Sequence, residues 1–265
     1  MEPEKQQQVG AMWALGDYAQ IAERLSPAAA AVVTTVSMRV GARGGRAALD
    51  VAAGTGSLTT ALAAAGWSVD AVDISPALAE QGRERTAQQG LDVRWHEAPL
   101  DTVPFDDGSA DLVGSSFGLI FASDSDQALG EMSRVLRPGG ALAFSAWTPR
   151  SYIAGMTDLM ATFMPEGPPS TIFRWGDPAV CVEWVGEYFD AVEMTTHTLP
   201  WHFESSRAAS DFMFTHSPGH VASLVYAGDR AQEMRTAVEQ QLDALASDGR
   251  IRIDAEYVVV SALRG

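Results

Sequence analysis

The sequence predicts a doubly wound α/β fold: a mostly parallel, seven-stranded sheet with N-terminal helices and a helical insertion between strands six and seven. Three observations support this. Short apolar segments alternate with helical segments from residue 47 to residue 147, a glycine turn at 54–56 follows the first of them, and an apolar run at 250–263 ends a long helical stretch. Strands that alternate with helices of this length form βαβ units, which build parallel sheets.

Two helices are expected before the first strand. Apolar residues at helical spacing predict one helix over 11–25, after a loose tail over 1–10. Ser26-Pro27 predicts the start of a second helix, because serine caps helix N-termini and proline favours the first helical position. This second helix is expected to end near residue 40, and residues 41–46 form a Gly/Arg connector.

The alternating region is expected to supply five strands, over 47–53, 67–72, 93–97, 110–115 and 141–147. The helices between them are expected over 57–65, 76–90 and 126–136. Gly66 marks the end of the first of these helices, and Ser75-Pro76 marks the start of the second.

The pattern loosens after residue 148. It predicts a loop over 165–169, a helix from Pro178 to Gly186, a sixth strand over 188–198 and a last strand over 250–263. We therefore expect an N-terminal helical lid (1–46), an α/β core (47–202 and 249–265) and a helical cap over the substrate (203–248).

Composition restricts the class of partner. The 265 residues suit one large α/β unit, and 34 acidic against 18 basic residues give a net charge of −16. Such a chain repels polyanions, so we expect a small-molecule partner and neither nucleic acid nor a membrane surface. The single cysteine, Cys181, excludes an internal disulfide and a cysteine zinc site. Together with a polar N-terminus and no spanning apolar run, it favours a cytoplasmic location.

Four motifs fall at the ends of predicted strands. They are the glycine turn at 54–56, Asp73, Glu97-Ala98 and the segment 115–118. The turn lets backbone approach a ligand closely, but Thr59 replaces the third glycine of a dinucleotide fingerprint and no P-loop lysine follows. Asp73 is placed to accept ribose hydroxyls, or else is an acid favoured by a helix start. Ligands of open parallel sheets bind beyond the carboxyl ends of the strands, so the four motifs predict one site.

The stretch from Asp50 to Thr148 resembles the class I S-adenosylmethionine-dependent methyltransferases, and among them the ubiquinone/menaquinone-methyltransferase-like group of small-molecule enzymes. The resemblance rests on LDVAAGTG at 49–56, VDISP at 72–76, VPFDDGSAD at 103–111 and RVLRPGG at 134–140. It implies a Rossmann-like fold and S-adenosylmethionine as cofactor, with S-adenosylhomocysteine as product. It does not specify the acceptor.

The resemblance also implies a set of cofactor-binding residues: Asp50, Ala52, Gly54, Thr55, Gly56, Asp73, Ile74, Glu97, Ala98, Ser116 and Phe117. Those at 50–56 would surround the methionine moiety, and Asp73 would bind the ribose while Ile74 packs on adenine. Glu97 and Ala98 would meet the adenine edge, and 116–117 would lie near the amino-acid end of the cofactor. Ala52 replaces the family's usual first glycine, and we expect its methyl group to fit.

Methyl transfer is an in-line displacement, for which an enzyme mainly supplies proximity and alignment. If the acceptor atom needs a base, His216 in the insertion is the best histidine candidate. Tyr18 is expected near the sulfonium if the N-terminal helices close over the cofactor; the alternative is a tyrosine packed in the core. No metal site is expected, because Pro218-Gly219 interrupts the turn between His216 and His220.

Three functions remain open at this stage. The first is methyl transfer to an O, N or C atom of a small apolar or aromatic metabolite, natural-product or quinone-like, which the aromatic-rich later region favours. The second is a protein of the same fold that binds the cofactor and catalyses another reaction, such as a cyclisation. The third is a non-catalytic binding module, which the intact Gly54, Gly56 and Asp73 disfavour. The sequence leaves a homodimer open.

Overall fold

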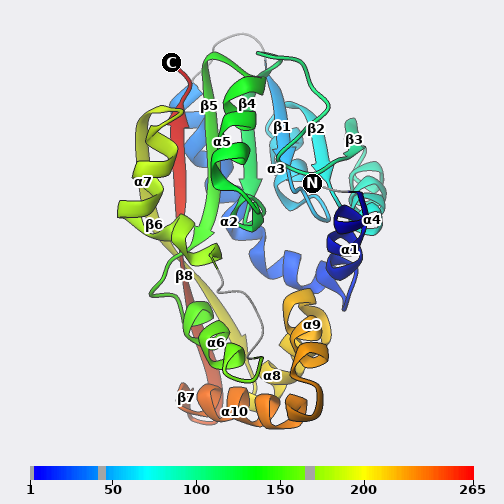
Figure 1. Cartoon of the computed structure of the whole chain (residues 1–265), viewed down its shortest axis with the longest axis vertical. Coiled ribbons are helices and arrows are strands. Elements are labelled where there is room, and N and C mark those ends of the chain that lie inside the picture. Colours follow the sequence, from blue (N-terminus) through cyan, green and yellow to red (C-terminus); the bar gives the residue numbers. More distant parts are fainter. Residues whose placement is uncertain (1–2, 41–45, 165–170) are drawn as a thin grey trace.

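A computed structural model describes residues 3–40, 46–164 and 171–265, and centres on one mixed sheet (Figure 1). The strands are β1 (Ala47–Val51), β2 (Ser68–Asp73), β3 (Val93–Glu97), β4 (Ala110–Ser116), β5 (Leu136–Trp147), β6 (Asp190–Phe203), β7 (Ala246–Ser247) and β8 (Arg250–Leu263). Their order is β3-β2-β1-β4-β5-β8-β6, and β7 pairs only with β8. The doubly wound, mostly parallel sheet is confirmed; the two-residue β7 makes eight strands where seven were expected.

Helices cover both faces of the sheet. In chain order they are α1 (Pro3–Trp13), α2 (Tyr18–Val40), α3 (Ser57–Ala64), α4 (Pro76–Gln88), α5 (Ser125–Val135), α6 (Tyr152–Ala161), α7 (Pro178–Gly186), α8 (Ser206–His216), α9 (Pro218–Ala227) and α10 (Ala231–Asp243). Three short 3-10 turns are η1 (Leu119–Phe121), η2 (Ile172–Gly176) and η3 (Gly228–Arg230). Helices α2 and α3 pack on one face, while α5 and α7 pack on the other (Figure 1).

The N-terminal region differs from the expected arrangement. Helix α1 begins at Pro3, where a loose tail was expected, and α2 continues from Tyr18 to Val40 through Pro27. Proline inside a helix leaves the carbonyl four residues earlier without its usual N–H partner. Here the Ser26 hydroxyl donates to the Glu23 carbonyl at 2.8 Å, so the helix can continue. The predicted connector lies, except for residue 46, outside the described residues, as does the predicted loop 165–169.

A long antiparallel hairpin carries the insertion. Strands β6 and β8 pair from Glu193↔Ser261 to Phe203↔Ile251, which extends them past the ends of the parallel strands. Helices α6, α8, α9 and α10 gather around this extension (Figure 1). Helix α6 therefore packs with the helices of 203–248, although it precedes them in sequence and was expected in the core.

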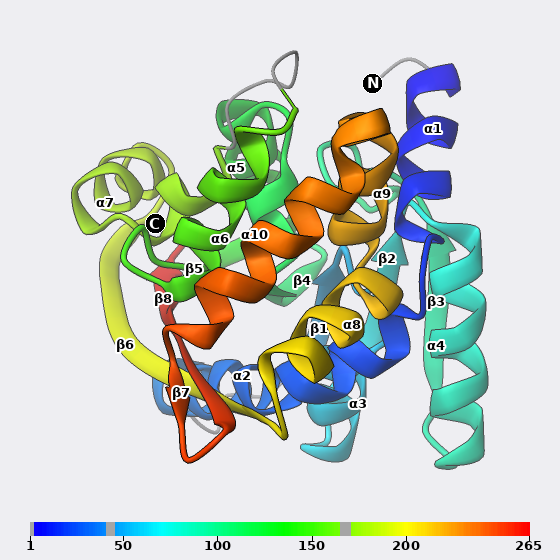
Figure 2. The same ribbon diagram turned by 90° about the horizontal axis from the view of Figure 1, so that it is seen from below.

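The carboxyl ends of the parallel strands share one edge. The register pairs Val51 with Val72, Asp73 with Glu97 and Ser116 with Ser145. Seen from below, α8, α9 and α10 lie across this edge, and α1 lies beside α4 and α9 (Figure 2). All four sequence motifs therefore reach one region under helical cover.

Candidate functional site

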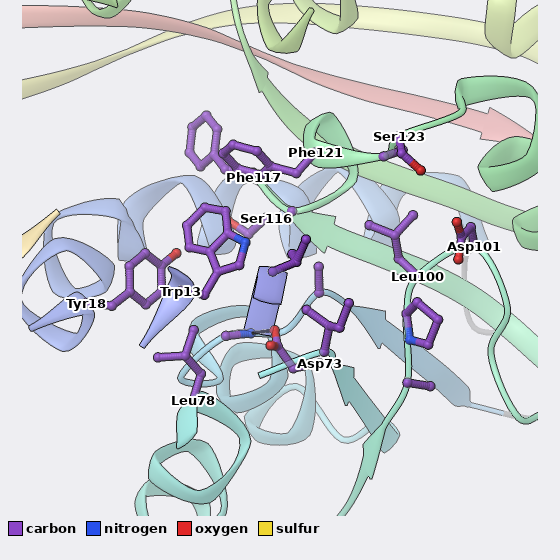
Figure 3. Close-up of a pocket in the computed structure, with 18 residues that line it drawn as sticks. Trp13, Tyr18, Asp73, Leu78, Leu100, Asp101, Ser116, Phe117, Phe121 and Ser123 are labelled. Atoms are coloured by element: carbon purple, nitrogen blue, oxygen red, sulfur yellow. Dashed lines mark hydrogen bonds between the residues drawn. The ribbon is translucent and has the colours of Figure 1, made fainter. Parts of the chain in front are cut away.

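Two adjoining cavities lie at this edge. The main cavity has a volume of about 710 Å³ and the side cavity about 300 Å³, both counted together with adjoining space that is open to solvent. The main cavity is lined by Val9, Trp13, Tyr18, Ala52, Gly54, Asp73, Ile74, Leu78, Ala98, Pro99, Leu100, Asp101, Ser116, Phe117, Gly118, Phe121, Ala122 and Ser123 (Figure 3). The side cavity is lined by Tyr18, Ala22, Leu25, Asp50, Ala52, Ala53, Thr55, Ser57, Leu58 and Ser116. Tyr18, Ala52 and Ser116 belong to both, so the cavities meet there.

The turn after β1 forms the floor where the cavities meet. Ala52 and Gly54 have φ of 51° and 57°, in the left-handed region that L-residues with a Cβ adopt only at a cost of about 1–2 kcal/mol. Ala52 thus occupies a position at which glycine would be unstrained. Gly56 lines neither cavity: it precedes α3 at φ 81°, with the Trp95 ring 3.1 Å from where its Cβ would lie.

Asp73 is buried at the end of β2 and ties three segments together. Its Oδ2 accepts the Gly54 N–H at 2.7 Å, and its Oδ1 accepts the Ser75 N–H at 2.8 Å. Burial raises the pKa of this carboxyl, while backbone N–H groups of Ser75, Gly54 and Ile74 oppose the rise. Each carboxylate oxygen retains lone pairs for further donors, so Asp73 can accept hydroxyl groups of a ligand in the main cavity.

Asp50 is the corresponding carboxylate of the side cavity. It is fully buried, its Oδ2 accepts the Thr59 hydroxyl at 2.6 Å, and its Oδ1 has no partner in the described structure. Burial and, to a smaller extent, the nearby Asp73 raise the pKa of Asp50 to about 7, against the opposing effect of the Thr59 hydrogen bonds. The hydroxyl of Thr55, also in this cavity, is buried without a partner. The side cavity is therefore built to receive hydrogen-bond donors.

The turn after β4 forms the opposite wall. Phe117 has φ 57°, and its N–H donates to Ser145 Oγ at 3.0 Å. The Phe117 ring stacks on Trp147 at 4.0 Å between centroids, with 21° between planes. Ser115 Oγ donates to the Val51 carbonyl and accepts the Leu119 N–H, both at 2.9 Å. These bonds hold the strained Phe117 backbone against the β1 turn.

The adenine edge differs from the expected arrangement. Ala98 lines the main cavity, but Glu97 is exposed and does not. The carboxylate in the cavity wall is instead Asp101, which is 5% exposed and whose Oδ1 has no hydrogen-bond partner in the described structure. Glu97 ends β3 and is followed by a loop that turns Ala98 to Asp101 inward. Sequence reasoning missed Asp101 because a loop residue carries no periodicity that would indicate its direction.

The N-terminal helices close one end of the main cavity. Trp13 ends α1 and Tyr18 begins α2, with their rings edge to face at 6.0 Å. Trp13 also contacts Phe121 of η1 edge to face at 4.6 Å. Burial, then Asp73 and Asp50, raise the pKa of Tyr18, so its hydroxyl remains protonated at neutral pH. Trp13 and Phe121 were not predicted, because aromatic residues at helical spacing usually belong to the core.

The second catalytic candidate, His216, lies elsewhere. It ends α8, and its Nδ1 is 3.8 Å from Asp17 Oδ2 in the α1–α2 connection. Its ring packs against Phe212 at 4.8 Å, and it lines neither cavity. The expectation that the insertion would bring His216 to the reacting atoms is therefore not met, because the end of α8 packs against that connection.

The charged side chains at the site are acidic. The lining of both cavities, as described, includes Asp50, Asp73 and Asp101 but no lysine, arginine or histidine. Across the described ranges no group of histidine, cysteine and acidic residues has a metal-binding arrangement. Over the same ranges, none of the helices combines the length and apolarity needed to cross a bilayer.

Comparison with known proteins shows which family this chain resembles. The profile of a family described as "Methyltransferase domain" matches residues 49–144. Uncharacterized protein Mb1440c of Mycobacterium bovis is 31% identical over 262 residues, covering 95% of this chain and 92% of that protein. Ubiquinone/menaquinone biosynthesis C-methyltransferase UbiE of Hahella chejuensis is 40% identical over 107 residues, covering 38% of this chain and 43% of its own length.

A solved structure has a similar fold. It is a Haemonchus contortus phosphoethanolamine N-methyltransferase in complex with S-adenosylhomocysteine, with a TM-score of 0.56 and 15% identity. The match covers 88% of this chain and 52% of that one. The segment matched by the profile runs from β1 to β5 and includes the turns that form most of the two cavities.

Proposed function

This chain belongs to the class I S-adenosylmethionine-dependent methyltransferases, and we propose that it methylates a small, uncharged acceptor of apolar or aromatic character. The observation that carries the proposal is the aromatic end of the main cavity, where Trp13 packs against Tyr18 and Phe121 beyond the residues that would hold adenosine. The described lining has no basic side chain there, so nothing would pair with a carboxylate or phosphate on the acceptor. The net charge of −16 supports the same choice against nucleic acids.

The residues present fit S-adenosylmethionine. Asp73 would accept the ribose hydroxyls in the main cavity, with Ile74 against the adenine ring. At the far end of that cavity, Asp101 would meet the adenine edge (Figure 3). Ala98, which belongs to the same lining, would contact the adenine ring. The unpartnered Asp50 Oδ1 in the side cavity would accept the ammonium of the methionine moiety.

The bound cofactor supplies a methyl group on a sulfonium, whose departure leaves a neutral thioether. The protein then has to align the acceptor and exclude water. Tyr18, which remains protonated, can donate a hydrogen bond where the cavities meet but cannot act as a base at neutral pH. No histidine lines either cavity as described, so we assign no general base and do not propose His216 for that role.

We also propose that the cap extends beyond the expected 203–248. Helix α6 packs against α10 and β8, and α1 packs against α9. The acceptor would therefore enter between the N-terminal helices and a cap that includes α6.

Asp101→Ala is expected to raise the dissociation constant of S-adenosylhomocysteine about ten- to a hundredfold, because it removes a charged acceptor for the adenine amine, worth roughly 1.5–3 kcal/mol. Glu97→Ala is the matched control and should change affinity less than about twofold, since Glu97 is exposed. Calorimetry with S-adenosylhomocysteine and its 6-oxo inosine analogue measures both. Wild-type protein should bind S-adenosylhomocysteine more tightly than the inosine analogue, and Asp101→Ala should bind the two with similar affinity. An unchanged preference in the variant would contradict the assignment.

Cofactor affinity is expected to fall as pH decreases through 7. The pKa of Asp50 is raised to about 7 in the free protein, so the carboxyl is largely protonated at pH 6. A cationic ammonium favours the ionised form, and binding at pH 6 should release about one proton and be about five- to tenfold weaker than at pH 8. Calorimetry in buffers of different ionisation enthalpy counts that proton. Asp50→Asn should flatten the profile, and a flat wild-type profile would refute the link.

The direct test of the function uses S-adenosylmethionine carrying an isotopic label in its methyl group. The protein is incubated with panels of neutral aromatic, polyketide-like and isoprenoid acceptors, and with carboxylate and phosphate acceptors as the contrasting set. Label in a neutral product supports the proposal. Product formed without label would instead indicate a cofactor-assisted reaction such as a cyclisation, and label only in anionic acceptors would overturn the proposed acceptor class.

A further inference from the structure

The residues that the N-terminal helices contribute to the main cavity are held in place by the insertion. Helix α1 supplies Val9 and Trp13 to the lining, and the start of α2 supplies Tyr18. We refer to residues 3–18 as the lid segment. The insertion lies directly against this region, because α9 packs on α1 and α8 packs on α2 (Figure 2). If the proposed function holds, the lid segment covers the bound cofactor, and the contacts that fix it control how the cofactor enters and leaves.

The first contact joins the α1–α2 connection to the end of α8. Gly16 has φ 70°, and a Cβ at this position would lie 2.8 Å from the His216 carbonyl oxygen and 2.9 Å from that of Thr215. Only a residue without a side chain allows the two backbones to approach so closely. Asp17, the next residue, has its Oδ2 3.8 Å from His216 Nδ1. The connection therefore rests on the backbone of α8, two residues before Tyr18.

The second contact lies further along α2. The guanidinium carbon of Arg24 is 4.5 Å from the centre of the Phe203 ring and 4.3 Å from the centre of the Phe212 ring. Ring faces are electronegative, so a cation placed over two of them is attracted to both. Phe212 and His216, whose rings are 4.8 Å apart, are separated by one helical turn. Both contacts therefore use the same face of α8.

We propose that α8 is a clamp that holds the lid segment closed over the cofactor, with Gly16 and Arg24 as the positioning residues at its two contacts. Helix α2 is fixed on β4, β5 and β8 of the sheet. Arg24 joins α8 to α2, and the end of α8 supports the connection through Gly16. The residues of both contacts are absent from the described linings of the cavities, so the clamp should favour the closed position equally with and without cofactor.

An equal effect on both states predicts a specific kinetic result. Weakening either contact should raise the open fraction of the free protein and of the cofactor complex, so that entry and release of the cofactor become faster together. The dissociation constant is the ratio of the two rate constants and should change little. A residue that touches the cofactor would behave differently, because its loss mainly speeds release.

Arg24→Met removes the charge and keeps an unbranched chain between the two rings. We expect the association and dissociation rate constants of S-adenosylhomocysteine both to rise about three- to tenfold, and the dissociation constant to change less than about twofold. Stopped-flow tryptophan fluorescence measures both rate constants, since Trp13 lies in the cavity wall. Arg174→Met is the matched control. The Arg174 guanidinium lies 4.5 Å from the Trp184 ring of α7, on the other face of the sheet from α2, and its loss should change neither rate constant.

Gly16→Ala tests the other contact, because its methyl group would overlap the carbonyl groups of α8 and displace the connection. The same joint rise in both rate constants is expected. Gly90→Ala is the control for backbone strain, since Gly90 has φ 68° with nothing within 4 Å of an added Cβ, and it should leave both rate constants unchanged. Thermal unfolding without ligand checks that each variant is folded, and each contact has its own variant.

Hydrogen exchange tests the clamp without a ligand. Backbone amides over residues 3–18 should exchange faster in Arg24→Met and Gly16→Ala than in wild type, while those of α5 should not change. Wild-type rate constants and wild-type exchange in both variants would overturn the proposal, and so would a rise in the dissociation rate constant alone. Wild-type protein that binds no S-adenosylhomocysteine would refute the proposed function itself, whereas faster exchange over 3–18 in both variants would still support the clamp.

Discussion

Replacing Asp73 with alanine is expected to raise the dissociation constant of S-adenosylmethionine about ten- to a hundredfold. The variant loses a pair of charge-assisted hydrogen bonds to the ribose, worth about 1.5–3 kcal/mol. It also frees the Gly54 and Ser75 N–H groups, which the Asp73 carboxylate holds at 2.7 and 2.8 Å. The cofactor turn would then lose part of its shape as well. Isothermal calorimetry with purified protein measures the effect.

The matched control is Asp70→Ala on the same strand. Asp70 pairs with Arg94 and with His96, where its Oδ1 lies 2.8 Å from the histidine Nε2, and it lines neither cavity. This variant should bind the cofactor about as well as wild type. Unchanged affinity in Asp73→Ala would show that the ribose does not bind at this carboxylate, and the placement of the cofactor would have to be abandoned.

Gly118→Ala is expected to lower the free energy of unfolding by about 2–3 kcal/mol, the upper part of the range for overpacking a tight interior. The backbone at Gly118 has an ordinary conformation, with φ −92° and ψ −43°, so the obstacle is space alone. An added Cβ would lie 2.5 Å from Ala52 Cβ and 2.7 Å from the Ala52 carbonyl oxygen. The β1 and β4 turns would separate, and cofactor binding should weaken with stability. Urea unfolding monitored by circular dichroism measures the loss.

Two further variants test whether overlap with Ala52 causes the loss of stability in Gly118→Ala. Gly186→Ala, at the end of α7, has nothing within 4 Å of the added methyl group and should not lower stability. Combining Ala52→Gly with Gly118→Ala removes the methyl–methyl overlap and should restore part of the lost free energy, although the contact with the Ala52 carbonyl remains. A single Gly118→Ala protein with the wild-type urea midpoint would show that the two turns do not pack as described.

The position of most residues predicted to hold the cofactor could be read from the sequence because its signals are local, while their binding of the cofactor stays a prediction. Asp73 follows a buried strand directly, and the strand–turn–helix pattern around Gly54 places backbone at the carboxyl edge of a parallel sheet. The structure brings Asp50, Thr55, Ser116 and Phe117 to the same two cavities, as expected. For such residues, position in the chain and direction in space are linked by the regular geometry of a strand and the turn after it.

The expectations that the structure does not match concern residues whose placement depends on contacts between segments distant in the sequence. Glu97 and Asp101 are four residues apart, and only the path of the loop after β3 decides which carboxylate faces the cavity. His216 was assigned from its place in the insertion, yet packing of α8 against the α1–α2 connection sets it beside Asp17. The break expected at Pro27 is absent because the Ser26 hydroxyl satisfies the freed carbonyl of Glu23. Each outcome depends on contacts that no periodicity records.

The sequence by itself therefore determined the sheet and the acidic character of this protein, since these follow from hydrophobic period, glycine turns and composition. It also indicated the cofactor class, through the resemblance of residues 50–148 to a known family. Only the tertiary structure decided that two cavities meet at Tyr18, that Trp13 packs edge to face against Tyr18 and Phe121, and that no basic side chain joins them in the described lining. The physical reason is that side chains from α1, α2 and the β4 turn are brought together by long-range packing.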